Sequence, residues 1–226
     1  MTAELQRIEI PGEHVQLWAA SLDRPPDRFA RHLSEPERAR AERYRREQIR
    51  DRFIVGRGLL RELLGEILGI TPGEVPITSE PDGKPMLTGE FAACHFNVSH
   101  SEGVAVYAVA QGRRVGVDVE QVRDIPNMVN LVERFFATAE CEAFRRLPGL
   151  EQRDAFFNGW TRKESLIKAR GESVQMLDRF EVSLTGEPRL LRHADCPGEE
   201  RRWAMWGRDL EGDFRVCVAE ELIADC

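Results

Sequence analysis

The order of the helical and extended patterns constrains the fold of this chain most. A long helical pattern, which predicts one or two helices, follows the start signal Ser34-Glu35-Pro36-Glu37 and runs to Leu68. Pro- and Gly-rich turns then lead into strand patterns over 91–120. The second half repeats this order, with helical patterns at 128–136, 139–147 and 154–170 and extended ones at 180–184, 190–192, 203–208 and 213–220. Both halves therefore run from helix to strands, and Gln111-Gly112-Arg113 is the natural boundary between them.

Composition excludes several classes of protein. The 226 residues, 42% hydrophobic and 31% charged, are enough for one large or two small folded domains and do not indicate a disordered or fibrous chain. A net charge of −7 does not favour binding to nucleic acid or to a membrane surface. No apolar run approaches the roughly 18 residues that suggest a membrane span. The N-terminus does not resemble a secretory leader, so we expect a cytoplasmic protein. The five cysteines are scattered without C-x-x-C spacing, which predicts reduced thiols and no zinc site.

One segment of this acidic chain is strongly basic. Nine arginines fall between residues 38 and 61, at Arg38, Arg40, Arg43, Arg45, Arg46, Arg50, Arg52, Arg57 and Arg61. Guanidinium groups bind phosphate and carboxylate well, so the cluster suits an anionic ligand. A solvated helical face with ion pairs one turn apart explains most of them equally well.

Two acids share one face of a strand. In Val115-Gly116-Val117-Asp118-Val119-Glu120 the valines alternate with Asp118 and Glu120, whose Cα atoms lie roughly 6.6 Å apart along a strand. Like charges this close repel, and two hard oxygen donors suit a magnesium ion better than zinc. A solvent-facing edge strand is the simpler alternative.

A third acid falls within an apolar helical stripe. Glu164 lies on the face formed by Phe157, Trp160 and Ile167, where a carboxylate is costly unless a cation compensates it. Lys168, one turn further on, could supply that charge as an ion pair with Glu164. The other possibility is a metal shared with the two strand acids.

Several further residues suit phosphate binding. Lys84 stands in the turn Asp82-Gly83-Lys84-Pro85, and Ser99 and His100 follow a strand pattern. No Gly-x-x-x-x-Gly-Lys-Ser/Thr loop and no Gly-x-Gly-x-x-Gly fingerprint occurs, and no Gly-x-Ser-x-Gly elbow surrounds Ser99. A serine hydrolase is therefore disfavoured.

Taken together, these motifs resemble a known family. Their order is Gly83-Lys84-Pro85, Phe96-Asn97-Val98-Ser99-His100-Ser101, Gly116-Val117-Asp118-Val119-Glu120, Arg134-Phe135-Phe136 with Glu140, and Trp160-Thr161-Arg162-Lys163-Glu164-Ser165-Leu166-Ile167-Lys168-Ala169. This set, spread over residues 34–184, resembles the long, pseudo-dimeric (surfactin synthetase activator-like) group of the 4′-phosphopantetheinyl transferases. The resemblance implies an α+β fold of two similar subdomains related by a pseudo-twofold, each a small, mainly antiparallel sheet packed with helices. We place the subdomains at 1–111 and 112–226, with the active site in the cleft between them.

The resemblance also implies an activity and a site. The family transfers 4′-phosphopantetheine from coenzyme A to a serine of an apo acyl- or peptidyl-carrier protein, using Mg²⁺ and releasing 3′,5′-ADP. By position, Asp118, Glu120 and Glu164 correspond to magnesium ligands. Coenzyme A contacts are implied at Arg40, Arg52, Lys84, Ser99, His100 and Lys168, and the catalytic residues at Glu164, Lys168, His100 and Glu140. Glu164, a metal-bound water and Glu140 are alternative general bases.

Two residues depart from the family pattern, and the activity has alternatives. Phe53 replaces a Thr, and Glu37 or Arg38 stands at the first phosphate-binding Lys. A non-catalytic binder of coenzyme A or carrier protein, or a magnesium-dependent hydrolase of the same cofactor, would use the same residues. Apolar residues at Ile125, Met128, Val129 and Leu131 are candidates for docking a carrier helix, although core packing explains them equally well. We expect a monomer.

Overall fold

The computed structural model describes residues 4–79 and 83–222. The first half contains β1 (Gln6–Ile8), β2 (Val15–Ser21), α1 (Asp27–Ala30), α2 (Glu35–Glu42), α3 (Glu47–Leu68), β3 (Ile77–Ser79), β4 (Pro85–Leu87), β5 (Cys94–Ser101) and β6 (Val104–Gln111). The second contains β7 (Val115–Gln121), α4 (Met128–Phe135), α5 (Thr138–Arg146), α6 (Gly149–Arg170), β8 (Phe180–Val182), β9 (Leu190–His193), β10 (Trp203–Leu210) and β11 (Phe214–Glu221). Short 3₁₀ turns connect some of these elements, among them Val174–Arg179.

The two halves repeat one arrangement of elements. Each runs from a strand (β2 or β7) through three helices to two hairpins, and the strand orders β5-β6-β2 and β10-β11-β7 correspond. The third helix of each half, α3 or α6, has 22 residues and ends at a glycine in the left-handed conformation, Gly69 or Gly171, which only glycine adopts at little cost. The predicted α+β fold of two similar subdomains with antiparallel sheets is confirmed.

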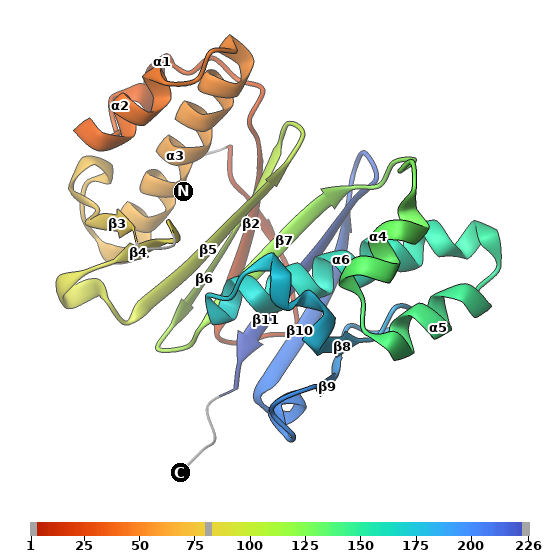
Figure 1. Cartoon of the computed structure of the whole chain (residues 1–226). Coiled ribbons are helices and arrows are strands. Elements are labelled where there is room, and N and C mark those ends of the chain that lie inside the picture. Colours follow the sequence, from red (N-terminus) through yellow and green to blue (C-terminus); the bar gives the residue numbers. More distant parts are fainter. Residues whose placement is uncertain (1–3, 80–82, 223–226) are drawn as a thin grey trace.

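The two sheets pack face to face in the middle of the molecule (Figure 1). One face of the first sheet carries Leu17, Ala19 and Val106 against Val117 and Val216 of the second. The opposite face of the first sheet is covered by α3, and that of the second by α6. The valines of the Val115–Glu120 motif are buried between the sheets, so Asp118 and Glu120 lie on the face of β7 that meets α6.

The sequence patterns located most elements but missed the first strand. β2 was not predicted, because its Leu17 and Ala19 face one core and its Trp18 and Ala20 the other, which removes the alternation typical of a half-buried strand. Helix α6 begins earlier than predicted, at Gly149, and is buried around most of its circumference rather than along one stripe. The predicted turn residues Pro81 and Asp82 lie outside the described residues.

The four cysteines that the structure describes, Cys94, Cys141, Cys196 and Cys217, are free thiols, and Cys226 lies outside the described part. Among the described residues, no helix combines the length and apolar character needed to span a membrane.

Close packing of α6 on β7 depends on Gly116. A Cβ atom at this position would lie 2.1 Å from the carbonyl oxygen of Ser165 and 2.4 Å from the backbone nitrogen of Ala169. We therefore expect Gly116→Ala to lower the free energy of unfolding by about 1–3 kcal/mol, because helix and strand must separate. Urea denaturation measures this effect. Gly149→Ala is the matched control, since its Cβ would meet no atom within 4 Å, and an equal loss in both variants would contradict the packing argument.

Candidate active site

Polar side chains of β5 join the two halves at one line of contact. Strands β5 and β7 belong to different sheets, and the side chains of Asn97, Ser99 and Ser101 bridge them. Asn97 Oδ1 accepts from the backbone N–H of Val117 at 3.0 Å, and the Ser101 hydroxyl donates to Glu120 at 3.1 Å. Because these positions alternate along β5, they share one face of the strand. We call this line the β5–β7 seam.

Lys168 from α6 completes the centre of the β5–β7 seam. Its Nζ lies 2.6 Å from Asp118 Oδ1 and 3.0 Å from Ser99 Oγ, and Ser99 donates to the same Asp118 oxygen at 2.8 Å. The structure records no ion pair of Glu164 within the described part of the chain. The predicted alternative, a Lys168–Glu164 pair, is therefore not what this conformation contains; Lys168 pairs with Asp118.

Three carboxylates influence one another electrostatically in the region of Lys168. Burial and the charges of Asp118 and Glu120 raise the pKa of Glu164 to about 7, although Lys168 opposes the shift. Burial likewise raises the pKa of Asp118, against Lys168 and Ser99, and burial with the charge of Asp118 raises the pKa of Glu120. The negative charges of Asp118 and Glu120 therefore act on Glu164. Repulsion among the three carboxylates favours the binding of a further cation beside them.

The donor set fits a hard divalent cation. Asp118 Oδ2 is buried and has no hydrogen-bond partner among the described residues, which leaves one oxygen open to a ligand. Carboxylate oxygens are the ligands that Mg²⁺ prefers. However, no group of three or more His, Cys, Asp or Glu residues within 4–79 and 83–222 is already gathered as a metal cluster. In this conformation the Lys168 ammonium supplies the positive charge at Asp118.

Two of the predicted phosphate contacts flank these groups. Lys84 Nζ donates to the backbone carbonyl oxygen of Lys168 at 2.6 Å, so this lysine lies beside the end of α6. His100, on β5, has a pKa lowered by burial and by the charges of Lys168 and Arg52. The imidazole is therefore neutral near pH 7 and offers one N–H.

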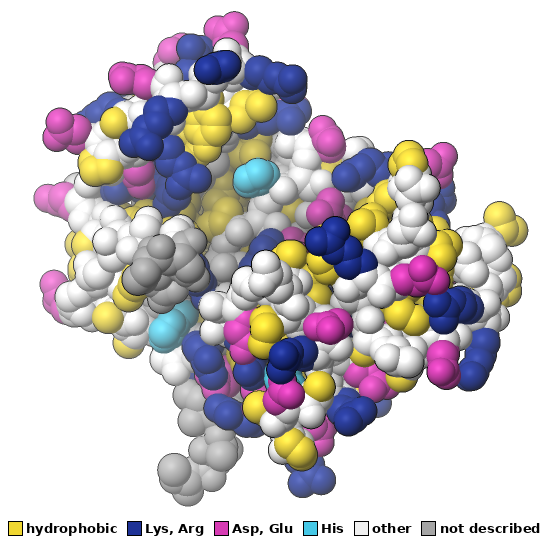
Figure 2. Space-filling view, in the orientation of Figure 1, with side chains coloured by type: hydrophobic (Ala, Val, Ile, Leu, Met, Phe, Trp, Pro, Cys, Tyr) yellow, Lys and Arg dark blue, Asp and Glu magenta, His cyan; other side chains and the backbone are white. Residues whose placement is uncertain are grey.

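The basic segment divides into paired and exposed arginines. Arg52 pairs with Asp23, and its charge reaches His100, so it lies near the site. Arg40 stacks over the ring of Phe53 at 5.2 Å and is exposed. Glu37 caps α2 through the Ser34 N–H and pairs with Arg61 at 2.7 Å, which gives this departure from the family pattern a structural role. Figure 2 shows Lys and Arg side chains on the lobe of α1–α3 beside a hollow whose floor is apolar.

Glu140, one of the alternative general bases, lies in a separate buried arrangement, and no hydrogen bond or ion pair joins it to Asp118, Glu120 or Lys168 within the described part of the chain. One carboxylate oxygen accepts from the Val182 N–H, and the other accepts from the Ala137 N–H and pairs with Lys163 at 2.6 Å. Glu140 caps α5 from a buried position, and Ala137 is the N-cap residue of this helix. Sequence reasoning missed Lys163 as its partner, because a lysine next to Glu164 gives no sign of which helix it will face.

The apolar residues proposed for carrier docking are mostly half-buried against the core. Ile125, Met128 and Leu131 pack against the cluster formed by Phe136, Phe144 and the middle of α6. Val129 alone among the four is exposed, at 46%. A docking surface in this region would therefore rest on few apolar side chains.

Comparisons with known proteins agree with the motifs. The sequence model of the 4′-phosphopantetheinyl transferase superfamily matches residues 114–219, and that of the N-terminal domain of 4′-phosphopantetheinyl transferases matches 17–112. The 4′-phosphopantetheinyl transferase HetI of Nostoc sp. is 40% identical over 193 residues, 83% of this chain and 81% of that protein. The 4′-phosphopantetheinyl transferase Sfp of Bacillus subtilis is 27% identical over 228 residues, 92% of this chain and 100% of that protein. The human L-aminoadipate-semialdehyde dehydrogenase-phosphopantetheinyl transferase is 28% identical, over 74% of this chain and 60% of that protein.

The predicted family, inferred first from short motifs, is confirmed by these matches over most of the chain. The chain is an enzyme of the long group and belongs to the 4′-phosphopantetheinyl transferase family.

Proposed function

We propose that the chain transfers 4′-phosphopantetheine from coenzyme A to a serine of an apo acyl- or peptidyl-carrier protein at the β5–β7 seam. The observation that carries this proposal is the contact of Lys168 and Ser99 with Asp118 across the two halves. The charges of Asp118 and Glu120 also raise the pKa of Glu164. Acids that raise one another's pKa, next to lysine and hydroxyl donors, are an arrangement suited to a metal-assisted phosphoryl transfer.

The site would hold Mg²⁺ through Asp118, Glu120 and Glu164. When bound, the ion would neutralise negative charge on the pyrophosphate of coenzyme A. Two observations support this assignment: the open, buried Oδ2 of Asp118 and the raised pKa values of all three acids.

The protein groups would orient the pyrophosphate and handle the proton. Lys84, Ser99, His100 and Lys168 present N–H and O–H donors to the phosphate oxygens. The carrier serine hydroxyl attacks the β-phosphorus, forming a new P–O bond, while the bond from that phosphorus to the bridging oxygen breaks and releases 3′,5′-ADP. A carboxylate of the site, for which Glu164 is a candidate, would accept the serine proton.

The halves, 1–111 and 112–226, would form the two walls of this site. β5 of the first contributes Ser99 and His100, while β7 and α6 of the second contribute the acids and Lys168. Since one chain supplies both walls, we propose that the monomer is active. Arg40 and Arg52 would meet the nucleotide from the first half.

The test is carrier modification. The purified protein is incubated with coenzyme A, Mg²⁺ and apo-carrier proteins from fatty-acid, polyketide and peptide synthesis, and intact mass spectrometry follows each carrier. We expect one phosphopantetheine per carrier and stoichiometric 3′,5′-ADP. If coenzyme A binds but no carrier is modified, the chain is a non-catalytic binding protein. If 3′,5′-ADP forms in the absence of carrier protein, the chain is a hydrolase.

Stability should depend on pH and on Mg²⁺ in a linked way. The pKa of Glu164 is raised from 4.5 to about 7 in the folded state, so between these values the folded state holds more protons than the unfolded one. The contribution of Glu164 to stability is therefore present below pH 4.5 and is lost as pH rises toward 7. Between pH 4.5 and 7, the free energy of unfolding of Glu164→Gln should fall less than that of the parent chain, as urea denaturation at several pH values would measure.

Mg²⁺ should offset that loss above pH 7. A ligand that binds only the folded protein stabilises it by about 2.7 kcal/mol at 100 times its Kd. Differential scanning fluorimetry of the protein stripped with chelator, with and without Mg²⁺, measures the shift. If Mg²⁺ raises the melting temperature of Glu164→Gln as much as that of the parent chain, Glu164 is not a ligand of the metal ion.

A further inference from the structure

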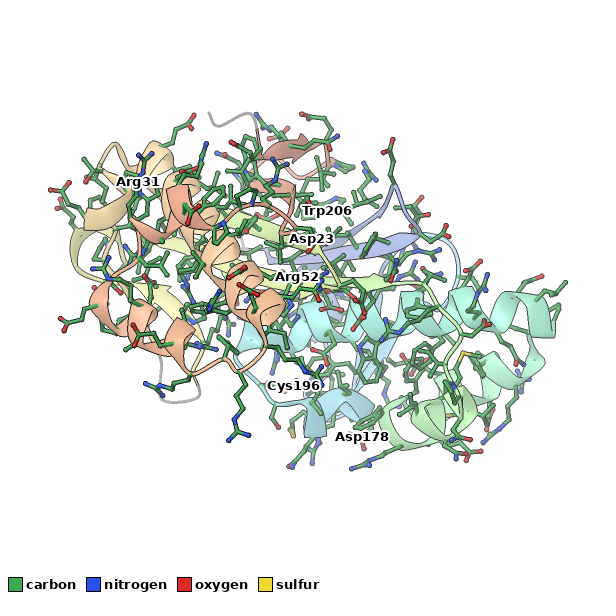
Figure 3. All side chains as sticks on the ribbon, turned by 90° about the horizontal axis from the view of Figure 1, so that it is seen from above. Asp23, Arg31, Arg52, Asp178, Cys196 and Trp206 are labelled. Atoms are coloured by element: carbon green, nitrogen blue, oxygen red, sulfur yellow. The ribbon has the colours of Figure 1, made fainter. Side chains whose placement is uncertain are left out.

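The side chain of Asp23 is held in place by contacts with helix α3 and with the β5–β6 turn, near the proposed coenzyme A site. It follows β2, and its carboxylate accepts two hydrogen bonds from Arg52 of α3: Nε to Oδ1 at 2.6 Å and Nη2 to Oδ2 at 3.0 Å. Figure 3 shows the two labelled side chains beside one another where α3 approaches the strands. The bidentate pair fixes the plane of the guanidinium group more firmly than a single contact would.

The β5–β6 turn closes the other side of this pair. A Cβ atom at Gly103 would lie 2.3 Å from Asp23 Oδ2 and 3.3 Å from Arg52 Nη2, so the turn packs directly on both groups. The backbone beside it is also held, because the Leu22 N–H donates to the Gly103 carbonyl oxygen at 2.7 Å. Three segments distant in sequence therefore meet at Asp23.

The pair leaves part of Arg52 available. Nε and Nη2 are bonded to Asp23, while Nη1 has no hydrogen-bond partner among residues 4–79 and 83–222. Burial and the charge of Lys168 lower the pKa of His100, and the charge of Arg52 lowers it further, so the guanidinium group is close enough to that ring to affect its charge. Arg52 is thus oriented on one side and open on the other, as a group that receives an anion must be.

We propose that Asp23 is a positioning residue that holds Arg52 beside His100 so that the free Nη1 meets a phosphate group of coenzyme A. This inference rests on the proposed function and deepens it, because it assigns a determinant of coenzyme A affinity to a residue that touches no substrate. Asp23 would act on substrate binding rather than on the transfer step, since its carboxylate contacts Arg52 and the β5–β6 turn and no contact joins it to Asp118 or Glu164 among the described residues.

Asp23→Asn is the direct test. The amide keeps the size of the carboxylate but cannot accept from both Nε and Nη2, so Arg52 is released. We expect the KM for coenzyme A to rise about 10-fold, with kcat and the melting temperature nearly unchanged. Arg52→Met should give a similar rise, and adding Asp23→Asn to Arg52→Met should have no further effect, because the two residues act as one unit.

Two comparisons identify the role and the phosphate. Asp51→Asn removes the same charge from another arginine–aspartate pair on α3, Arg50 with Asp51 at 3.0 Å, and should leave the KM unchanged. If Nη1 meets the 3′-phosphate, dephospho-coenzyme A, which lacks it, should show no difference between Asp23→Asn and the parent chain. If it meets the pyrophosphate, both substrates should show the rise.

Other results would overturn the inference. A lower KM in Asp23→Asn would show that Asp23 competes with the substrate for Arg52, and equal changes in Asp23→Asn and Asp51→Asn would show a general charge effect. Isothermal titration of coenzyme A keeps the test separate from the proposed function: if the parent chain transfers no phosphopantetheine, the change in Kd still decides the role of Asp23.

Discussion

Asp118→Asn should reduce phosphopantetheine transfer by about 10³-fold while the protein stays folded. Asp118 is the buried centre of the site: one oxygen accepts from Lys168 and Ser99, and the other is open. An amide of the same size loses the negative charge needed to bind a cation and to hold the Lys168 ammonium. Losses of this size are typical when one preorganised electrostatic group is removed from an active site.

Initial rates with a fixed carrier protein measure the loss, and circular dichroism verifies the fold. Asp124→Asn is the matched control: it removes an acid four residues after Glu120, from a side chain that is 99% exposed. It should retain full activity. If Asp118→Asn transfers phosphopantetheine at a near-normal rate in chelator-treated buffer with defined Mg²⁺, Asp118 is not a ligand of the metal ion.

Lys163→Met should cause the largest loss of stability, about 3–5 kcal/mol. Lys163 is 0% exposed, and its Nζ donates to the carbonyl oxygens of Leu177 and Phe180 as well as pairing with Glu140, which is 2% exposed. Removal of the ammonium leaves a buried carboxylate without its cation. The free energy of unfolding, measured by urea denaturation, should fall accordingly.

A second variant distinguishes the charge effect from simple loss of packing. Lys163→Met combined with Glu140→Gln removes both charges and should recover much of the lost stability, since a neutral pair needs no compensation. Arg145→Ala, which breaks an exposed pair with Glu133, should leave stability nearly unchanged. If the double variant is no more stable than Lys163→Met, the ion pair is not the cause.

The buried pair also explains how α6 delivers its functional residues. Lys163 anchors one side of the helix to α5 and to the segment around Phe180, while Gly116 allows the opposite side to lie directly on β7. Glu164 and Lys168 then face the strand acids. Helix α6 therefore carries both residues that fix its position, such as Lys163, and residues of the candidate site. The position of the helix decides which acid Lys168 contacts.

Local patterns were sufficient for much of the fold. The start of α2, the end of α3 and the positions of β5, β6 and β7 follow from capping residues, turn glycines and alternation, all of which depend on neighbours within a few residues. The break between α2 and α3 was not located. β2 was missed because a strand buried on both faces lacks alternation. Helix α6 begins at Gly149, earlier than the predicted start at residue 154, because tertiary packing and not one apolar stripe determines its extent.

The sequence by itself determined that Val117 and Val119 would face one way and Asp118 and Glu120 the other, because side-chain direction alternates in any extended strand. It also indicated the family, since the motifs keep their order. Only the tertiary structure decided that Lys168 pairs with Asp118, that Lys163 neutralises Glu140, and that Asp23 orients Arg52. The physical reason is that charge pairing depends on distance in space, and these distances are set by how helices and sheets pack across the whole chain.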